Sequence, residues 1–413
     1  MSGTAQPHAA AEAVPWLDIV GIGEDGMAGL TPPARRVVEE AQVIVGGDRH
    51  HRLSDRVTAQ RLAWPSPFDA MIDTIRGLKG RRAVVLVTGD PLWYSVGARI
   101  VRAIDPGEVR FHPQLSAFQL AACRLGWSLA DVEAVTIHGR AASQILPHLA
   151  PRVRMLVLTK DANSPRTVAD LLCRHGFGDS RMVALAAMGG PREARFEGSA
   201  RDWNHAVPDF HVLAVECRAG ADGRWYPRTG GLPDEAFVHD GQLTKRDVRA
   251  ATIAKLAPFP DARLLDVGAG CGSVSVEWMR AARGAHAVAV EPKADRRSMI
   301  EANARELGTQ KIAVVAGRAP QALDGLDAVD AAFIGGGMSD PAVFEAAWNL
   351  LRGGGRLVAN VVTLEGEGRL AELHASHGGT LCRLAVSHAE PVGPYRGWRP
   401  AMSVTQWCVV KPA

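Results

Sequence analysis

Two glycine-rich turns, more than two hundred residues apart, constrain this chain more than any other feature of its sequence. The first reads Val20-Gly21-Ile22-Gly23, and the second, from Leu265 to Gly272, reads LDVGAGCG. Glycine permits sharp backbone bends and leaves room for backbone N–H groups to approach a ligand. Because the two turns differ in spacing and surroundings, they predict two different α/β architectures, each with its own ligand site.

The second turn indicates the kind of ligand. An apolar run over residues 263–267 precedes it and a helical pattern follows it, which predicts a strand, a turn and a helix. Asp266 stands two positions before the first glycine, where a carboxylate repels a dinucleotide pyrophosphate but attracts an ammonium group. Glu291 ends the next apolar run, nineteen positions after Gly272, and can accept hydrogen bonds from both ribose hydroxyls. The pattern favours S-adenosyl-L-methionine over NAD.

Length and composition bound the remaining possibilities. The 413 residues predict two domains, at about 150 residues or more per domain. Residues 219–241 are rich in Gly, Pro and Asp and predict a linker, with one domain over 14–218 and the other over 242–413. A net charge of +3, from 47 basic and 44 acidic residues, gives no support for nucleic acid or a membrane as partner.

The cysteines and the N-terminus suggest a cytoplasmic protein. Six cysteines are scattered without a C-x-x-C pair, so neither a zinc site nor a disulfide framework is expected. The first fifteen residues lack the pattern of a signal peptide and are expected to form a flexible tail. No apolar run approaches the roughly 20 residues that span a bilayer.

The C-terminal half predicts a mostly parallel sheet. Strand-like and helix-like segments alternate, and the two last strands are joined by a loop too short for a helix, so they are expected to pair antiparallel. This is the Rossmann-like arrangement of class I methyltransferases. The predicted strands are residues 263–267, 286–291, 311–316, 330–335, 356–362, 380–387 and 402–410.

The N-terminal half also predicts an α/β fold. Several of its strands end in turn residues such as Thr88-Gly89-Asp90-Pro91, and ligands of open α/β sheets bind at the carboxyl ends of strands. These turns are therefore expected to converge on one crevice. The predicted strands are residues 17–21, 43–45, 83–88, 109–111, 132–138, 153–159, 181–186 and 210–215.

Longer segments carry a resemblance to known families. The N-terminal half, with GIGEDG, VIVGGDRH, VLVTGDPLWYSVG, SAFQLAACRLGW and IHGR, resembles the tetrapyrrole methylases that act on corrin precursors. The C-terminal half, from LTKRDVRA through LLDVGAGCGSVSVEW, FIGGGM and GGGRLVANVVTLE to AEPVG, resembles the smaller corrin-pathway methyltransferase that also decarboxylates. Fused in this order, the halves resemble the precorrin-6Y C5,15-methyltransferase (decarboxylating) family of the vitamin B12 route.

The resemblance implies one S-adenosyl-L-methionine site per domain. In the N-terminal domain it implies Gly21, Gly23, Thr88, Gly89, Asp90, Ser116 and Ala117. In the C-terminal domain it implies Thr244, Gly268, Ala269, Gly270, Cys271, Gly272, Glu291 and Ala319. Asp266, which precedes the same glycine turn, is expected to belong to this site as well. Arg318 stands where an acidic residue often meets the adenine amino group, so that contact departs from the family pattern.

The expected reactions need few catalytic side chains from the protein. Methyl transfer from a sulfonium is an in-line displacement that depends on alignment, and an enamine-like carbon needs no strong base. Decarboxylation needs an electron sink, and a conjugated imine of the tetrapyrrole can serve. Supporting groups are expected at Asn360, Thr363, Glu365 and His388, and the loop 391–399 offers aromatic rings and two guanidiniums to a flat polycarboxylate.

The resemblance assigns carbon 15 and decarboxylation of the ring C acetate to the C-terminal domain, and elimination leaves carbon 5 to the N-terminal domain. The expected substrate is precorrin-6Y (precorrin-6B), the product precorrin-8X, and the protein a homo-oligomer. Four alternatives stay open: a cobalt-precorrin version of the same reactions, an RNA methyltransferase, a regulatory protein that binds S-adenosyl-L-methionine without turnover, and an NAD enzyme.

Overall fold

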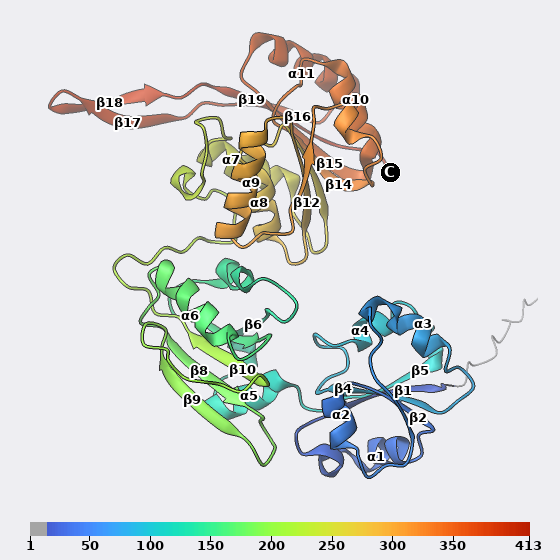
Figure 1. Ribbon diagram of the computed structural model, residues 1–413. Helices are drawn as coiled ribbons and strands as arrows, with labels where there is room; N and C mark the ends of the chain where they lie inside the picture. The colour runs from blue at the N-terminus through green and yellow to red at the C-terminus, as the bar shows by residue number, and fades with distance from the viewer. Residues whose placement is uncertain (1–14) are drawn as a thin grey trace, which may run out of the picture. The chain divides into compact units, whose positions relative to one another are not determined.

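The computed structural model describes residues 15–413, which divide into two compact units. The first unit runs to residue 140 and includes residues 151–223, whereas residues 141–150 and 224–413 form the second. Strands and helices alternate in both, as Figure 1 shows. The tail expected over the first fifteen residues lies, apart from its last residue, outside the described residues.

The first sheet of the first unit is parallel throughout. Its strands are β1 (Leu17–Ile22), β2 (Val43–Val45), β3 (Gln60–Leu62), β4 (Ala83–Thr88) and β5 (Val109–His112), with helices α1 (Pro32–Glu39), α2 (Asp48–Leu53), α3 (Met71–Arg76) and α4 (Gly97–Ile100). The order is β3-β2-β4-β1-β5. The carboxyl ends of all five strands therefore meet at one edge of the sheet.

Both faces of this sheet are buried, which explains the continuous apolar runs in its sequence. Successive side chains of a strand point to opposite faces. Ile19 and Val85 accordingly belong to a core that includes α3, whereas Val20 and Leu86 belong to a second core that includes α1. A parallel sheet covered on both faces is the arrangement that such runs predict.

The second sheet of the first unit is mixed. Its strands are β6 (Val132–Thr136), β7 (Arg154–Leu158), β8 (Arg181–Ala186), β9 (Ala194–Ser199) and β10 (His211–Glu216), with helices α5 (Ala117–Leu125) and α6 (Ser164–Arg174). The order is β6-β7-β10-β8-β9, in which β6 and β7 pair parallel and the other pairs are antiparallel. The sequence did not predict β9, because this edge strand carries the charged residues Arg195 and Glu197 in place of an apolar run.

The second unit contains the expected seven-stranded sheet. Its strands are β11 (Arg263–Val267), β12 (His286–Glu291), β13 (Ala313–Ala316), β14 (Val329–Ile334), β15 (Leu351–Val361), β16 (Thr380–Leu384) and β19 (Val404–Val410). Its helices are α7 (Arg246–Leu256), α8 (Ser273–Ala281), α9 (Ala294–Glu306), α10 (Pro341–Leu350) and α11 (Leu364–His377). The order is β13-β12-β11-β14-β15-β19-β16, with β19 antiparallel to both neighbours. The predicted Rossmann-like fold is confirmed.

A hairpin replaces the loop expected between the last two strands. Strand β16 ends at Leu384, three residues before the predicted end, and β17 (Ser387–Val392) pairs antiparallel with β18 (Tyr395–Pro400). The two strands form a sheet of their own that projects from the rest of the unit (Figure 1). The sequence did not reveal the hairpin, because both its faces are largely exposed and no apolar alternation marks it.

Short 3-10 helices occupy several connections. They are η1 (Gly26–Gly29), η2 (Phe68–Ala70), η3 (Pro106–Glu108), η4 (Leu129–Asp131), η5 (Ala142–His148), η6 (Asp234–Ala236) and η7 (Gln321–Leu323). Within residues 15–413, no helix combines the length and the apolar character that crossing a bilayer requires.

The segment 219–241, expected as a linker, belongs in large part to the second unit. Leu232 and Phe237 are buried in a core that includes Cys271 and Val276. Residues from 224 onward cluster with this unit, as do residues 141–150.

Candidate functional site

The glycine-rich turn of the second unit connects β11 to α8. Gly268, Gly270 and Gly272 have φ angles of +71°, +59° and +79°, which glycine adopts far more readily than other residues. A Cβ on Gly268 would lie only 3.1 Å from the backbone nitrogen of Gly336. The turn thus packs against the glycines that follow β14, and larger residues at these positions would displace it.

The carboxylate of Glu291 lies beside this turn, at the end of β12. It is 2% exposed, and its two oxygens accept hydrogen bonds from the backbone N–H groups of Gly270 at 2.9 Å and Lys293 at 3.0 Å. Each carboxylate oxygen can accept a further hydrogen bond. The position and remaining capacity of Glu291 fit the two hydroxyls of a ribose.

Asp266 lies beneath the turn, one residue before the end of β11, and is 1% exposed. Its Oδ2 accepts hydrogen bonds from Oγ of Ser275 at 2.6 Å and from the backbone N–H of the same residue at 3.2 Å. Its Oδ1 has no hydrogen-bond partner among the described residues. Burial, aided by repulsion from Glu291, raises the pKa of Asp266 to about 6, although the hydrogen bonds from Ser275 oppose the shift. A donor or a cation nearby would relieve this unfavourable burial.

The other residues expected around the second turn lie at the same edge of the sheet. Ala319, 7% exposed, follows β13, and Thr244 precedes α7, where its carbonyl oxygen accepts a hydrogen bond from Arg249. The carbonyl oxygen of Gln242 would lie 3.4 Å from a Cβ on Gly270. We call residues 242–244, 266–272, 291–293, 317–319 and 335–337 the C-terminal loop cluster. Its turn, its ribose-type carboxylate and its orphaned buried acceptor fit an adenosyl ligand that carries a cationic group.

The predicted turns of the first unit also converge. A Cβ on Gly21 would lie 1.9 Å from the carbonyl oxygen of Gly89, and a Cβ on Gly89, whose φ is +64°, would lie 2.9 Å from Cα of Ser116. A Cβ on Gly190, after β8, would lie 2.6 Å from Cβ of Glu24. We call residues 21–24, 88–90, 114–117 and 187–190 the N-terminal loop cluster. Backbones this close require glycine, which explains the turn motifs in the sequence.

The remaining expected residues of this cluster mainly shape its backbone. A Cβ on Gly23 would lie 2.6 Å from Oδ1 of Asp25. Oδ1 of Asp90 accepts hydrogen bonds from the backbone N–H groups two and three positions further on, at 2.7 and 3.2 Å. Ser116 caps α5 through a capping box with the glutamine three positions later, and Ala117 begins that helix. These contacts hold the loops of the cluster in place.

Sequence reasoning missed a connected group of side chains at this edge. The guanidinium of Arg49 forms an ion pair with Glu24, and its Nη1 donates to Oγ1 of Thr88 at 2.9 Å. Nε2 of His50 lies 3.1 Å from the same oxygen, and the ring of Phe210 lies 4.0 Å from the guanidinium carbon. We call these five residues the Arg49 cluster. The motif VIVGGDRH contains two of them, but nothing in the sequence indicates their partners 25 or more positions away.

The four residues expected to support decarboxylation have different surroundings. Nδ2 of Asn360 donates to Oγ1 of Thr252 at 3.0 Å in a largely buried polar group. Thr363 is the N-cap of α11, and Glu365 is exposed in the first turn of that helix. His388 lies on the hairpin strand β17 with a side chain 64% exposed, 3.9 Å from a carboxylate oxygen of Asp247. Asn360 and Thr363 thus have evident structural roles, whereas Glu365 and His388 are accessible.

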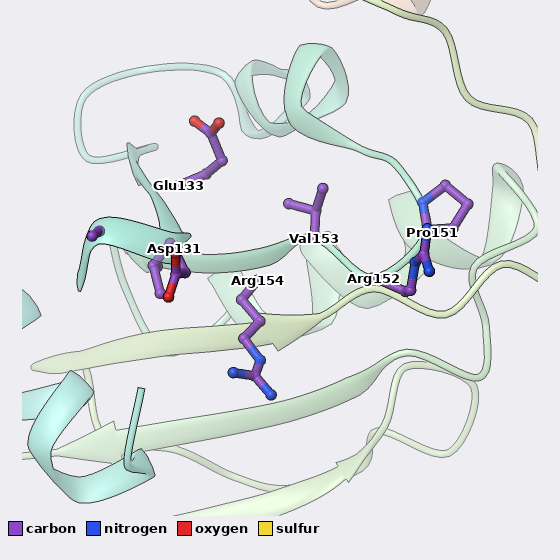
Figure 2. A pocket seen from close by; sticks show the side chains of 8 residues that line it. Asp131, Glu133, Pro151, Arg152, Val153 and Arg154 are labelled. Atoms are coloured by element: carbon purple, nitrogen blue, oxygen red, sulfur yellow. The ribbon is translucent and has the colours of Figure 1, made fainter. Parts of the chain in front are cut away.

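A cavity of about 400 Å³ lies elsewhere in the first unit (Figure 2). Residues 130–133 and 151–154, which precede or begin β6 and β7, line it. Its arginines are partly neutralised, since Arg154 pairs with Glu216 at 3.2 Å. The cavity lies at the amino ends of parallel strands, opposite to the edge where ligands of such sheets bind. We therefore do not assign it to the reaction.

Comparison with known proteins gives a consistent result for both units. Residues 17–203 match the family model of tetrapyrrole (corrin/porphyrin) methylases, and residues 235–411 match that of the precorrin methyltransferase domain. The chain is 44% identical over 399 residues to precorrin-6Y C(5,15)-methyltransferase [decarboxylating] of Sinorhizobium sp, which covers 96% of this chain and 97% of the relative.

Two shorter relatives match parts of the chain. Cobalt-precorrin-7 C(5)-methyltransferase of Salmonella typhimurium is 30% identical over 167 residues, 40% of this chain and 82% of the relative. A probable cobalt-precorrin-6B C(15)-methyltransferase (decarboxylating) of Pyrobaculum calidifontis is 36% identical over 146 residues, 34% of this chain and 74% of the relative.

The two folds and their loop clusters define a two-domain methyltransferase that depends on S-adenosyl-L-methionine. The match over nearly the whole length with the Sinorhizobium relative makes the assignment specific. The chain belongs to the precorrin-6Y C5,15-methyltransferase (decarboxylating) family. The resemblance seen in the sequence is confirmed.

Proposed function

We propose that this chain methylates carbons 5 and 15 of precorrin-6Y and decarboxylates its ring C acetate, giving precorrin-8X in vitamin B12 biosynthesis. The observation that carries the proposal is the 44% identity over 96% of the chain to a relative whose name states both methylations and the decarboxylation. Each domain has its own loop cluster, which supports one S-adenosyl-L-methionine per domain.

We assign carbon 5 to the N-terminal domain, and carbon 15 with decarboxylation to the C-terminal domain. Two single-activity relatives support a chain with two separable activities, because one is named for carbon 5 alone and the other for carbon 15 with decarboxylation, and each matches 40% of the chain or less. The two activities therefore occur on separate polypeptides among relatives. The precorrin methyltransferase model matches only the C-terminal half.

Apolar side chains on and next to the N-terminal loop cluster offer a surface suited to a macrocycle. Leu92, Trp93 and Tyr94 follow Asp90 and are 50%, 38% and 45% exposed, and Leu115 is 54% exposed. Exposed apolar side chains grouped at a site favour contact with a flat, apolar ring. The bound S-adenosyl-L-methionine supplies the methyl group, while the protein aligns an already nucleophilic carbon with it.

In the C-terminal domain, we propose that the substrate supplies its own electron sink. Loss of carbon dioxide from the acetate leaves an electron pair in the conjugated imine of the macrocycle, and a proton then converts the remaining methylene to a methyl group. Glu365 and His388 are the accessible candidates to hold or deliver that proton. The hairpin adds Trp398, 77% exposed, and the exposed Arg396, whose guanidinium suits a carboxylate of the macrocycle, whereas Arg399 pairs with Glu390 at 2.7 Å.

We also propose a homo-oligomer that works in the cytoplasm. The hairpin and the segment after it support the first part, because Tyr395 and Trp398 of β18 and Met402, two residues beyond β18, are each more than 70% exposed. The six cysteines are free, which agrees with a reducing compartment. Light scattering of the wild type and of Trp398→Ser tests the assembly; a wild-type monomer would contradict it.

The function is tested with the intact chain, metal-free precorrin-6Y and S-adenosyl-L-methionine labelled in its methyl group. Mass spectrometry of the product is expected to show two labelled methyl groups and the loss of one carbon dioxide. Glu291→Ala is expected to impair methylation at carbon 15 and leave carbon 5 methylated. Turnover of cobalt-precorrin substrates alone, or carbon 5 methylation lost with Glu291, would contradict the proposal.

A further inference from the structure

The hydrogen bonds of the Arg49 cluster fix the tautomer of His50. The backbone N–H of Gly47 donates to Nδ1 of His50 at 3.2 Å, so Nδ1 is an acceptor and the ring hydrogen lies on Nε2. The neutral ring is favoured because burial, and secondly the charge of Arg49, lower the pKa of His50 to about 4. Nε2 therefore donates to the hydroxyl oxygen of Thr88.

Thr88 is thereby held as a hydrogen-bond donor. Its Oγ1 accepts from both Nη1 of Arg49 and Nε2 of His50, which occupies the two lone pairs of the hydroxyl. The hydroxyl hydrogen must find its acceptor elsewhere. Because Thr88 ends β4 immediately before Gly89, which contacts Ser116, this donor lies within the N-terminal loop cluster.

Arg49 holds a second donor without an acceptor. Its Nη2 is buried and has no hydrogen-bond partner among the described residues. Burial of an unpaired guanidinium N–H is unfavourable unless a ligand or an ordered water accepts its hydrogen bond. The ion pair with Glu24 and the ring of Phe210 fix this guanidinium from two other directions. The cluster is therefore rigid and incompletely satisfied.

We propose that Thr88 and Arg49 form a donor pair that binds one carboxylate in the N-terminal site, with His50 as the positioning residue that orients Thr88. A hydroxyl and a guanidinium that touch each other match the two oxygens of a single carboxylate. The inference rests on the proposed function, in which both ligands of this domain carry carboxylates. The source is either the methionine part of the cofactor or a peripheral carboxylate of the tetrapyrrole.

The experiment uses the full chain with Arg49→Lys, Thr88→Val, Thr88→Ser, His50→Leu and His50→Gln. Arg154→Met is the matched control, because Arg154 also pairs with a glutamate and lies 5.1 Å over a tryptophan ring. Arg154 begins β7, outside the N-terminal loop cluster. Methylation at carbon 5 is measured together with methylation at carbon 15, which reports an intact chain. Cofactor affinity is measured with S-adenosyl-L-methionine and with its decarboxylated analogue.

We expect Arg49→Lys, Thr88→Val and His50→Leu to impair carbon 5 methylation by about ten-fold or more, with carbon 15 methylation retained. Thr88→Ser, which keeps the hydroxyl, and His50→Gln, which keeps a donor, are expected to recover most of the activity. Arg154→Met is expected to leave both methylations unchanged.

The two sources of the carboxylate give different results. If it belongs to the cofactor, the wild-type preference for S-adenosyl-L-methionine over the decarboxylated analogue disappears in Arg49→Lys. If it belongs to the tetrapyrrole, cofactor affinity is unchanged and KM for the tetrapyrrole rises. If both the affinity for S-adenosyl-L-methionine and the KM for the tetrapyrrole are unchanged in Arg49→Lys, the inference is overturned. A wild type that does not methylate carbon 5 refutes the proposed function instead.

Discussion

The guanidinium of Arg249 and the carboxylate of Glu277 form an ion pair in which both side chains are fully buried, with Nε 2.6 Å from Oε1. Glu277 also accepts hydrogen bonds from the backbone N–H groups of Gly231 at 2.7 Å and Leu232 at 2.8 Å. Arg249 donates to the carbonyl oxygens of Leu232 and Thr244. The pair thereby fastens the segment before α7 to α8 and holds Thr244 at the C-terminal loop cluster.

Glu277→Gln is expected to lower the free energy of unfolding by about 1 to 3 kcal/mol, because it removes the buried carboxylate and leaves only Asp234, at 3.1 Å, to balance the charge of Arg249. Arg352→Met is the control, since its side chain is 48% exposed and its pair with Asp330 is expected to contribute about 1 kcal/mol or less. Urea denaturation of both variants tests this expectation. Equal effects of the two substitutions would contradict it.

The raised pKa of Asp266 makes stability depend on pH. An unfolded Asp has a pKa of about 3.9, so between that value and about 6 the unfolded chain ionises at Asp266 while the folded chain keeps the proton. The contribution of this residue is greatest below that window and is lost as the pH rises through it. Relative to Asp266→Asn, the wild type is expected to lose about 2 to 3 kcal/mol across the window without cofactor. If the curves of unfolding free energy against pH run parallel for the wild type and Asp266→Asn, the raised pKa of Asp266 is contradicted.

Glu291→Ala is expected to weaken cofactor binding at the second site by about 1 to 3 kcal/mol, through the loss of hydrogen bonds to the ribose. Glu301→Ala, an exposed position on α9, serves as the control and is expected to have no effect. Calorimetric titration with S-adenosyl-L-homocysteine measures both. Unchanged affinity in Glu291→Ala would remove this residue from the site.

Gly21→Ala is expected to abolish methylation at carbon 5 and to destabilise the first unit by about 1 to 3 kcal/mol, because its Cβ would lie 1.9 Å from the carbonyl oxygen of Gly89. Gly77→Ala is the control, since its Cβ would make ordinary contacts at 3.4 and 3.6 Å. Product analysis and thermal denaturation compare the two. A Gly21→Ala enzyme with normal carbon 5 methylation would contradict the convergence of these loops.

The sequence predicts the parts of the fold that local pattern encodes. Strands β1 and β4 are buried on both faces and are apolar except for Asp18 in β1 and Thr88 at the end of β4. The turns at Gly21, Gly89 and Gly268 require glycine for close backbone contact. The exposed strands β9, β17 and β18 carry no such pattern. Their hydrogen bonds to neighbouring strands, not their side chains, define them.

The candidate site is predictable only where its chemistry depends on sequence spacing. Glu291 follows the glycine turn at a fixed interval, so its position at the turn could be anticipated. The contact of Arg49 with Thr88 joins residues 39 positions apart, and that of Arg249 with Glu277 joins residues 28 apart. Such contacts arise from tertiary packing. Thr363, by contrast, carries a readable local signal, because a threonine before a helix with acidic residues in its first turn is typical of an N-cap.

The number of cofactor sites per chain tests the central claim most directly. Calorimetric titration of the intact chain with S-adenosyl-L-homocysteine is expected to show two equivalents, of which Glu291→Ala weakens one and Gly21→Ala removes the other. A single equivalent per chain, or two equivalents that both weaken in Glu291→Ala, would contradict a pair of independent methyl-transfer sites.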